Sequence, residues 1–112
     1  MTGNFPERGD VFWVSLDPAI GSETRKTRPC LVLSNNKGNQ MSRLVMIAPI
    51  TSKTKKIYDF ETAVSIAGKS GKVMLNQCRA VDKSRLGNKE CHLDNSVMDQ
   101  VDEALRIVFA LS

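Results

Sequence analysis

The stretch DVFWVSLDPAIGSETRKTRPCLVLSN, residues 10–35, contains two apolar segments separated by a charged one. Residues 10–16 mix β-branched, aromatic and aliphatic side chains, which is typical of a strand. Residues 30–35 are predicted to form a second strand that Pro29 begins, because proline lacks the N–H that the middle of a strand needs. The stretch therefore predicts two strands joined by a long loop over residues 17–28.

The loop between these strands carries more charge than a turn needs. A tight hairpin connection is usually satisfied by Gly with Asn or Asp, whereas this loop places Arg25, Lys26 and Arg28 around one acid, Glu23. The proline that follows Arg28 biases its backbone toward an extended conformation. We therefore expect Arg28 to project from the mouth of a strand, and Arg25 and Lys26 to lie on the loop itself.

The rest of the body is predicted to be short antiparallel strands. Their pattern of β-branched and apolar residues between turn residues is typical of a twisted sheet or small barrel. The expected strands cover residues 43–51, 59–66 and 72–82, the last as one strand or a bent pair. The expected connections are turns at residues 35–40 and 67–72 and a basic loop at residues 52–56. Pro49 is expected to mark an edge or a bulge.

From Asp94 onward the apolar residues follow a helical period. The apolar face contains Val97, Met98, Val101, Ala104, Leu105, Val108 and Phe109. Most charged residues fall outside this face, as in an amphipathic helix that packs on a core. Asp94 or Asn95 is expected to cap it. The predicted fold is therefore mainly β with a helix (α+β): a twisted antiparallel sheet forming a small barrel, closed by a C-terminal helix.

The size of the chain fits one domain over residues 1–112. Its 12.4 kDa, with 41% hydrophobic and 25% charged residues, predict a globular protein with one core. No apolar run is long enough to span a membrane, and no signal-peptide pattern opens the sequence. We therefore expect a cytoplasmic protein with no membrane partner.

The charge is distributed unevenly along the chain. Residues 1–93 contain 15 Lys and Arg against 8 Asp and Glu, whereas residues 94–112 contain one Arg and four acids. A basic body suggests a polyanion partner, most commonly nucleic acid. Ordinary solubilising charge is the alternative interpretation.

Several kinds of site are disfavoured by residue counts. Three cysteines without a C-x-x-C pair, and the single His92, argue against a disulfide framework and a zinc site. Cys30 is expected to be a small buried hydrophobe and His92 a packing or capping residue. No carboxylate cluster suggests a two-metal nuclease. We expect neither a metal nor a cofactor, so phosphate chemistry would use Arg, Lys, hydroxyl groups and Glu23.

The segment GKSGK at residues 68–72 is similar to the end of a phosphate-binding loop. That pattern needs a Gly five residues before Gly68, where this chain has Ala63, and it needs a strand-to-helix junction. The segment is therefore predicted to be a turn with solvated lysines.

The order of short motifs along the chain resembles the MazF/PemK/Kid family of bacterial toxins, the mRNA interferases. The matching residues are Gly9-Asp10, Asp17-Pro18, Gly21-Ser22-Glu23, Arg28-Pro29 and Pro49-Ile50-Thr51. The similarity continues through NQCRAVDKSRLGNKECHLDNSVMDQVDEAL, residues 76–105, which is close to Gram-positive members. Each motif is weak alone, but their order and spacing cover almost the whole chain.

The resemblance implies a small SH3-like barrel with a C-terminal helix that forms a homodimer. It also implies metal-independent, sequence-specific cleavage of single-stranded mRNA, and a cognate antitoxin whose acidic C-terminal segment silences the enzyme. The family's catalytic Arg and Thr fall on Arg28 and Thr51, and Glu23 matches a proposed base. The expected RNA-binding residues are Ser22, Arg25, Lys26, Ser52, Lys53, Asn76 and Gln77.

This chain departs from its relatives mainly in the loop. Thr24, Arg25 and Lys26 replace Gly or Gln of many members, and Asn76 replaces an acid found in some. These differences leave catalysis unaffected in principle but make the recognised RNA sequence an open question. Asn76 and Gln77 are suited to reading base edges, because amides offer donors and acceptors. Phe12 and Trp13 are candidates for base stacking, although strand position favours packing for at least one of them.

The chemistry follows from RNA itself. Attack of the 2′-OH on the adjacent phosphate gives a 2′,3′-cyclic phosphate and a 5′-OH end. A guanidinium can stabilise the extra negative charge because its planar fork matches two phosphate oxygens. The group that takes the 2′-OH proton is left open between Glu23, a water and Arg28.

Two other interpretations were considered. The first is a non-catalytic SH3-like barrel that binds RNA or protein, in which the arginines only hold phosphates. The second is a gyrase-poisoning branch of the same fold, which depends on a C-terminal Trp-Gly-Ile. This chain ends in Phe109-Ala110-Leu111-Ser112, which disfavours that branch.

Overall fold

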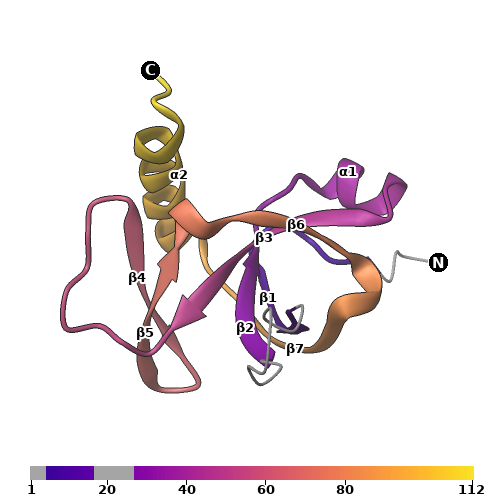
Figure 1. The fold of residues 1–112 in the computed structure, drawn as a ribbon, viewed down its shortest axis with the longest axis horizontal. Coiled ribbons are helices and arrows are strands. Elements are labelled where there is room, and N and C mark those ends of the chain that lie inside the picture. The colour runs from indigo at the N-terminus through magenta and orange to yellow at the C-terminus, as the bar shows by residue number, and fades with distance from the viewer. Residues whose placement is uncertain (1–4, 17–26) are drawn as a thin grey trace, which may run out of the picture.

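The computed structural model describes residues 5–16 and 27–112, and within them a single antiparallel sheet carries a helix at its C-terminal end (Figure 1). The strands are β1 (Asp10–Ser15), β2 (Thr27–Val32), β3 (Leu44–Thr51), β4 (Glu61–Ile66), β5 (Lys69–Met74), β6 (Arg79–Asp82) and β7 (Leu86–His92). The helices are α1 (Asn36–Met41), α2 (Asn95–Phe109) and the 3-10 turns η1 (Leu75–Gln77) and η2 (Lys83–Arg85). The predicted fold class is confirmed.

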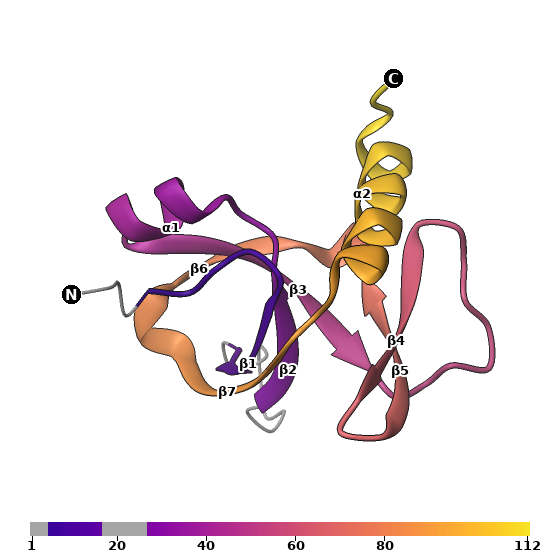
Figure 2. The ribbon, with the colours of Figure 1, turned by 180° about the vertical axis from the view of Figure 1, so that it is seen from behind.

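The sheet is organised around β3. The strand order is β4-β5-β3-β2-β1-β7, and β6 pairs with β3 as well. β5 and β6 lie along the same edge of β3, with Val73 opposite Ile50 and Arg79 opposite Ile47, and η1 interrupts them. Residues 72–82 are thus the bent pair of strands that the sequence allowed. Figures 1 and 2 show the sheet curling into an open half-barrel.

Pro49 lies where the ladder on this edge is interrupted. Between the β3–β5 and β3–β6 pairs, Ala48 and Pro49 have no partner recorded in β5 or β6. A residue without an N–H is tolerated at such a place. Pro49 thus lies at an interruption of the pairing on one side of an interior strand, and not on an edge strand as one of the two expectations had it.

Both faces of the sheet are buried, because side chains alternate along each strand. Leu31, Ala48 and Ile50 point into the core beneath α2, together with Val101 and Ala104 of the helix. The opposite face, inside the curl, is filled by Val14, Cys30, Val32, Val45, Ile47 and Val81. Cys30 is fully buried, as predicted.

The helix α2 begins and packs largely as its period predicts. The backbone N–H of Val97 donates to Asp94 Oδ1 at 3.0 Å, so Asp94 is the cap. Met98, Val101 and Ala104 are buried against the sheet. The inclusion of Phe109 in the buried face was wrong: it is 55% exposed, because the last turn extends beyond the sheet (Figure 1). No helix in the described ranges is long and apolar enough to cross a membrane.

Two boundaries differ from the prediction. Residues 35–40 were expected to be a turn, but α1 follows Asn35, whose side chain accepts from the Gly38 N–H at 2.7 Å. Asn39 is fully buried, and its Nδ2 donates to the Ser34 carbonyl at 2.9 Å. Pro29 was expected to begin its strand but is third in β2. The ladder of β2 with β3 starts only at Cys30, so Pro29 precedes the doubly paired part.

The GKSGK segment is not a turn with solvated lysines. The turn consists of Ala67 and Gly68, both with positive φ (53° and 78°), as a two-residue hairpin between β4 and β5 requires. Lys69 is exposed, but Lys72 is buried inside β5. The exclusion of a phosphate-binding loop stands, because the segment lies in a hairpin. Strand β7, which was not predicted, pairs with β1 through two irregular steps.

Candidate active site

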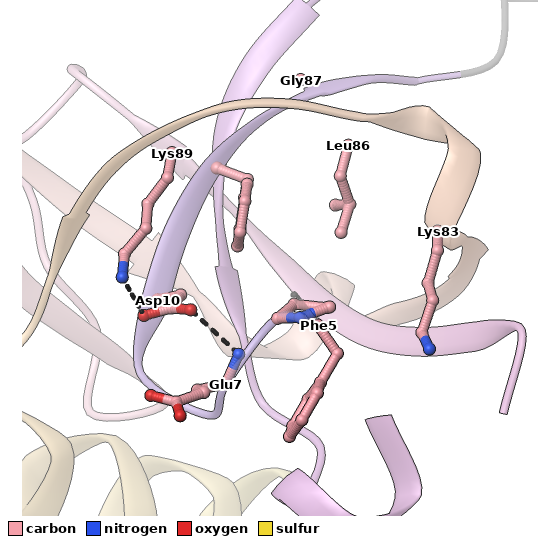
Figure 3. Close-up of a pocket in the computed structure, with 9 residues that line it drawn as sticks. Phe5, Glu7, Asp10, Lys83, Leu86, Gly87 and Lys89 are labelled. Atoms are coloured by element: carbon pink, nitrogen blue, oxygen red, sulfur yellow. Dashed lines mark hydrogen bonds and ion pairs between the residues drawn. The ribbon is translucent and has the colours of Figure 1, made fainter. Parts of the chain in front are cut away.

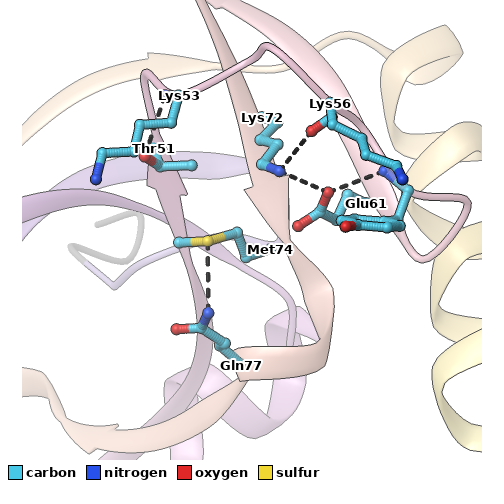
Figure 4. Close-up of polar contacts among 8 residues, drawn as sticks. Thr51, Lys53, Lys56, Glu61, Lys72, Met74 and Gln77 are labelled. Atoms are coloured by element: carbon cyan, nitrogen blue, oxygen red, sulfur yellow. Dashed lines mark hydrogen bonds and ion pairs between the residues drawn. The ribbon is translucent and has the colours of Figure 1, made fainter.

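A pocket of about 360 Å³ opens where β2, β3 and β5 meet. Its lining residues are Leu16, Arg28, Pro49, Thr51, Lys53, Lys72, Met74 and Gln77. Figure 4 shows Thr51, Lys53, Lys72, Met74 and Gln77 around this opening. Four residues predicted from the sequence, Arg28, Thr51, Lys53 and Gln77, are therefore brought together.

The register of the sheet accounts for this arrangement. The β2–β3 ladder ends with Cys30 opposite Pro49. Arg28 and Thr51 lie two residues beyond this pair on their strands, on the same face as it, and both line the pocket. In the β3–β5 ladder Thr51 is opposite Lys72. Residues directly opposite each other in neighbouring strands point to the same face. Arg28, Thr51 and Lys72 thus form one row across three strands.

Thr51 keeps its hydroxyl proton available. Its Oγ1 accepts a hydrogen bond from the backbone N–H of Lys53 at 3.2 Å. A hydroxyl has one donor and two acceptor sites, so this bond orients Oγ1 while its O–H can donate to a substrate oxygen. The same bond brings the start of the loop after β3 against the pocket.

Arg28 is half-buried on β2, opposite Val14 of β1. Its guanidinium has no hydrogen-bond or ion-pair partner among residues 5–16 and 27–112. Burial raises the pKa of the neighbouring Cys30 thiol to about 12, although the charges of Arg28 and Arg79 act in the opposite direction. The thiol is therefore neutral and no nucleophile, whereas Arg28 offers an anion a positive fork in a half-buried position.

Lys72 is the pocket residue that sequence reasoning missed. Its side chain is 11% exposed, and Nζ donates to Glu61 Oε1 at 2.8 Å and to the Lys56 carbonyl at 2.7 Å. Burial by itself would raise the pKa of Glu61, but the hydrogen bonds from Lys72 and the Tyr58 N–H, with the charge of Lys72, lower it. Glu61 is thus an ionised partner of Lys72. Only the pairing of β4 with β5 reveals this contact.

The other predicted residues lie elsewhere. Ser52 borders a second hollow of about 210 Å³ that Thr51 also lines, together with Trp13 and Glu90. Asn76 does not line the pocket of Arg28 and Thr51; it faces a separate hollow beside α2. The remaining predicted residues, Ser22, Glu23, Arg25 and Lys26, lie outside the described residues.

The aromatic pair on β1 is divided between two environments. Phe12 packs against the core inside the curl, which meets the expectation that at least one of the pair packs. Trp13 is 39% exposed, and its Nε1 donates to Glu90 Oε1 at 2.9 Å. Trp13 is therefore the aromatic residue that remains accessible from the second hollow.

Another hollow, of about 540 Å³, lies around Asp10 and away from this row (Figure 3). Asp10 Oδ1 lies 3.1 Å from Lys89 Nζ and 2.7 Å from His92 Nδ1, and Oδ2 accepts from the Glu7 N–H at 2.9 Å. Burial alone would raise the pKa of Asp10, but these hydrogen bonds and the Lys89 charge lower it. The His92 side chain is 49% exposed and lies against Gly9, where an added Cβ would come within 2.9 Å of its ring.

The same cluster contains candidate metal ligands. Within the described residues, Glu7, Asp10 and His92 form the group whose ligand atoms all lie within 4.8 Å of one another. Both oxygens of Asp10 already accept from protein donors. The arrangement therefore serves the entry of the chain into β1, and we assign it no cation.

The chain matches a known protein family over most of its length. Residues 7–109 match the family model described as the PemK-like, MazF-like toxin of type II toxin-antitoxin systems. The chain is 41% identical over 111 residues to Endoribonuclease EndoA of Bacillus subtilis (strain 168), covering 94% of this chain and 95% of that protein.

Solved structures give the same result. The MazE-MazF crystal structure (Form-II) from Deinococcus radiodurans matches with a TM-score of 0.81 and 31% identity, over 96% of this chain and 97% of that one. An endoribonuclease in complex with its cognate antitoxin from a mycobacterial species shares the fold, with a TM-score of 0.79 at 22% identity over 96% and 97% of the two chains. The chain therefore belongs to the PemK-like, MazF-like toxin family of type II toxin–antitoxin systems.

Proposed function

We propose that this toxin is an endoribonuclease that cuts single-stranded mRNA at a short sequence without a metal ion. The enzyme class is supported by family membership and by 41% identity to an endoribonuclease over almost the whole chain. The products would be a 2′,3′-cyclic phosphate and a 5′-OH end, because the nucleophile is the RNA's own 2′-OH. We further propose that residues 1–112 act as one domain in the cytoplasm.

The observation that carries this proposal is the row of Arg28 and Thr51 in one pocket. The guanidinium of Arg28 can donate two parallel hydrogen bonds to the phosphate oxygens as the phosphorane forms. The Thr51 hydroxyl, oriented by the Lys53 N–H, can donate a third. Donors fixed before the reaction stabilise developing charge without reorganising.

The proton acceptor is proposed to be Glu23. Among the described residues, no Asp, Glu or His lines the pocket. Glu61, which pairs with the lining residue Lys72, is held ionised by it and is not proposed to transfer the proton. Glu23 is the acid of the loop that leads to Arg28, and a water or Arg28 itself is the alternative acceptor.

The RNA is proposed to follow the basic residues around the pocket. Lys53 lines it, and Ser52 follows Thr51 toward the second hollow. Ser22, Arg25 and Lys26 are proposed to contact the backbone from the loop before β2. We propose that Gln77, which lines the pocket, reads a base beside the cleaved bond. Asn76, which lines a separate hollow, is proposed to read a base further along the RNA.

The proposed protein partners follow from the family. Relatives of known structure form complexes with their antitoxins. We propose that this toxin is a homodimer, and that the acidic C-terminal segment of its own antitoxin covers the basic surface that RNA uses. The excess of Lys and Arg over acids in residues 1–93 favours such a partner.

Cleavage in the presence of EDTA tests the proposed function. Purified protein, with EDTA in excess, should cut a single-stranded RNA and leave a 5′-OH end. A DNA version should survive, whereas the same DNA with one ribonucleotide at the cut site should be cleaved there. A strict requirement for Mg²⁺, or equal cleavage of duplex RNA, would contradict the mechanism. Binding of the RNA without cutting would favour the non-catalytic barrel.

A further inference from the structure

The loop between β3 and β4, residues 52–60, carries three lysines, of which Lys53 lines the pocket. Figures 1 and 2 show it as a wide excursion from the sheet. Lys53, Lys55 and Lys56 are exposed on it, and only Thr54 and Phe60 are partly buried. A loop that is mobile in the free protein loses binding free energy when RNA orders it. What holds this loop therefore affects RNA binding.

Side chains of the sheet hold the loop at both ends. At the start, Thr51 Oγ1 accepts from the Lys53 N–H. At the end, Lys72 Nζ reaches from β5 to the Lys56 carbonyl and to Glu61, and Glu61 Oε1 also accepts from the Tyr58 N–H at 3.0 Å. Figure 4 shows these bonds converging on Glu61 and Lys72. One buried ion pair thus binds the backbone of the loop at two points.

Aromatic contacts extend this attachment. The rings of Tyr58 and Phe60 stack with centroids 5.2 Å apart. Lys56 Nζ lies 4.8 Å and Lys72 Nζ 5.7 Å from the Tyr58 centroid, within the range of cation–π attraction. The orientation of the Lys56 side chain is therefore linked to that of Lys72 through one ring.

Stabilising the fold does not by itself explain why Lys72 and Glu61 form a buried ion pair. Both side chains are mostly buried, at 11% exposure for Lys72 and 6% for Glu61. Replacing a buried pair by apolar residues of similar volume is often neutral or stabilising, because both charges pay a desolvation penalty. An apolar pair, however, cannot accept from the Tyr58 N–H or donate to the Lys56 carbonyl.

We infer that Lys72 and Glu61 are positioning residues that hold the β3–β4 loop, so that its lysines are already placed for the RNA backbone. The inference rests on the proposed function for its ligand. In this role Lys72 does not contact the reacting phosphate, since its ammonium is already engaged by Glu61 and Lys56. It acts through Lys53, Lys55 and Lys56.

The double variant Lys72→Met/Glu61→Leu separates positioning from stability. We expect its melting temperature to stay near that of the wild type, whereas amide exchange over residues 53–60 becomes faster. The KM for RNA should rise roughly tenfold, as expected when one or two long side chains must be ordered on binding, with kcat nearly unchanged. Arg106→Gln/Glu103→Gln, which removes an exposed ion pair from α2 and likewise keeps the net charge, is the charge-matched control and should leave both values unchanged.

The outcomes are distinct. A double variant with wild-type melting temperature, loop protection and KM would overturn the inference and leave the pair a packing feature. If that variant instead unfolds, Glu61→Gln, which keeps an oxygen acceptor for the Tyr58 N–H but removes the charge, is compared with the wild type. KM and amide exchange over residues 53–60 should then change together, and a tenfold rise in KM with unchanged loop protection would contradict positioning. Failure of the wild type to cut RNA would refute the proposed function, while exchange over residues 53–60, measured without RNA, still tests the attachment.

Discussion

Thr51 and Lys72 are opposite each other in the register of β3 and β5, and both line the pocket that contains Arg28. Their polar groups are in different states. The Thr51 hydroxyl is oriented by the Lys53 N–H and keeps a proton to donate, whereas the Lys72 ammonium is engaged by Glu61 and the Lys56 carbonyl. One row of the sheet thus combines a group suited to reaction with a group that fixes the adjacent loop.

Replacing Arg28 by Ala should slow cleavage far more than it weakens binding. The guanidinium meets charge that develops in the transition state, so the single-turnover rate should fall about a hundredfold or more. Arg28→Lys should restore only part of the rate, because a point charge does not span two oxygens. Affinity is measured with an RNA blocked by a 2′-deoxy residue at the cut.

Arg25→Ala and Lys26→Ala are the matched comparisons, since each removes one charge from the same loop. Each should weaken binding and reduce the slope of log K against log salt by ~0.7 per lost phosphate contact. If Arg28→Ala cleaves at a nearly normal rate while Arg25→Ala is inactive, the roles within this loop are assigned wrongly.

Thr51→Val keeps the shape of the side chain but removes the hydroxyl. The rate should fall by roughly a hundredfold, as for other lost donors to a developing oxyanion, and the Lys53 N–H loses its acceptor. Thr51→Ser should retain most of the activity because it keeps Oγ. Single-turnover cleavage of the three proteins checks this, and equal rates for Val and Ser would rule out a donor role.

Arg28 could be predicted from a local signal, because it precedes Pro29 at a strand mouth. Thr51 was assigned from the family resemblance, since a Thr that ends the apolar run of β3 by itself indicates only a β-branched strand residue. Lys72 has no such signal. Its partner Glu61 is eleven residues away, and the two meet only because β4 and β5 pair with Ala63 opposite Lys72. A sequence pattern shows that a lysine lies in a strand, but the register shows whether it is solvated.

Strand β7 and helix α1 were not predicted from the sequence for a similar reason. In β7, residues Gly87, Asn88 and Lys89 are exposed, so this edge strand lacks the apolar alternation by which the others were predicted. Helix α1 is only six residues long and is stabilised by Asn35 and the buried Asn39, residue types that favour turns by propensity. Tertiary contacts determine both structures, and no local pattern reports them.

Stability should fall in acid partly through Glu61. Its pKa in the folded protein is below the ordinary 4.5, so the folded state binds fewer protons than the unfolded state when pH drops below that value. The contribution of this carboxylate is therefore complete above pH 4.5 and is lost as pH falls through the lowered pKa. Melting temperatures between pH 7 and pH 3 should fall less steeply for Glu61→Gln. An identical slope would show that the pair contributes nothing to acid sensitivity.

Ala110→Gly should stabilise the protein. Ala110 caps the C-terminus of α2 with φ 56° and ψ 43°, which is a left-handed conformation. This conformation costs an alanine about 1–2 kcal/mol, and Gly avoids that cost. Gly, however, loses about 0.5–1 kcal/mol more backbone entropy than Ala on folding, which offsets part of the gain. A net gain of up to about 1 kcal/mol should appear as a higher urea midpoint with an unchanged m-value. Ala104→Gly is the control: at this fully buried helix position the substitution should destabilise.

Gln77→Ala should change which RNA sequence is cut, whereas Asn76→Ala should not change the base preferred at the cut itself. Gln77 lines the pocket with Arg28 and Thr51, and the only contact recorded for its amide within the described residues is from Nε2 to Met74 Sδ at 3.5 Å. Sulfur is a weak acceptor, so the amide can turn to a base edge at little cost. Asn76, one residue earlier, faces the hollow beside α2.

Cleavage of a randomised RNA pool, with the ends sequenced, compares the two variants with the wild type. Gln77→Ala should relax selection at a position adjacent to the cleaved bond by about tenfold, the lower part of the range for a lost base contact. An unchanged sequence profile for Gln77→Ala, with a shift at that position for Asn76→Ala, would reverse the assignment.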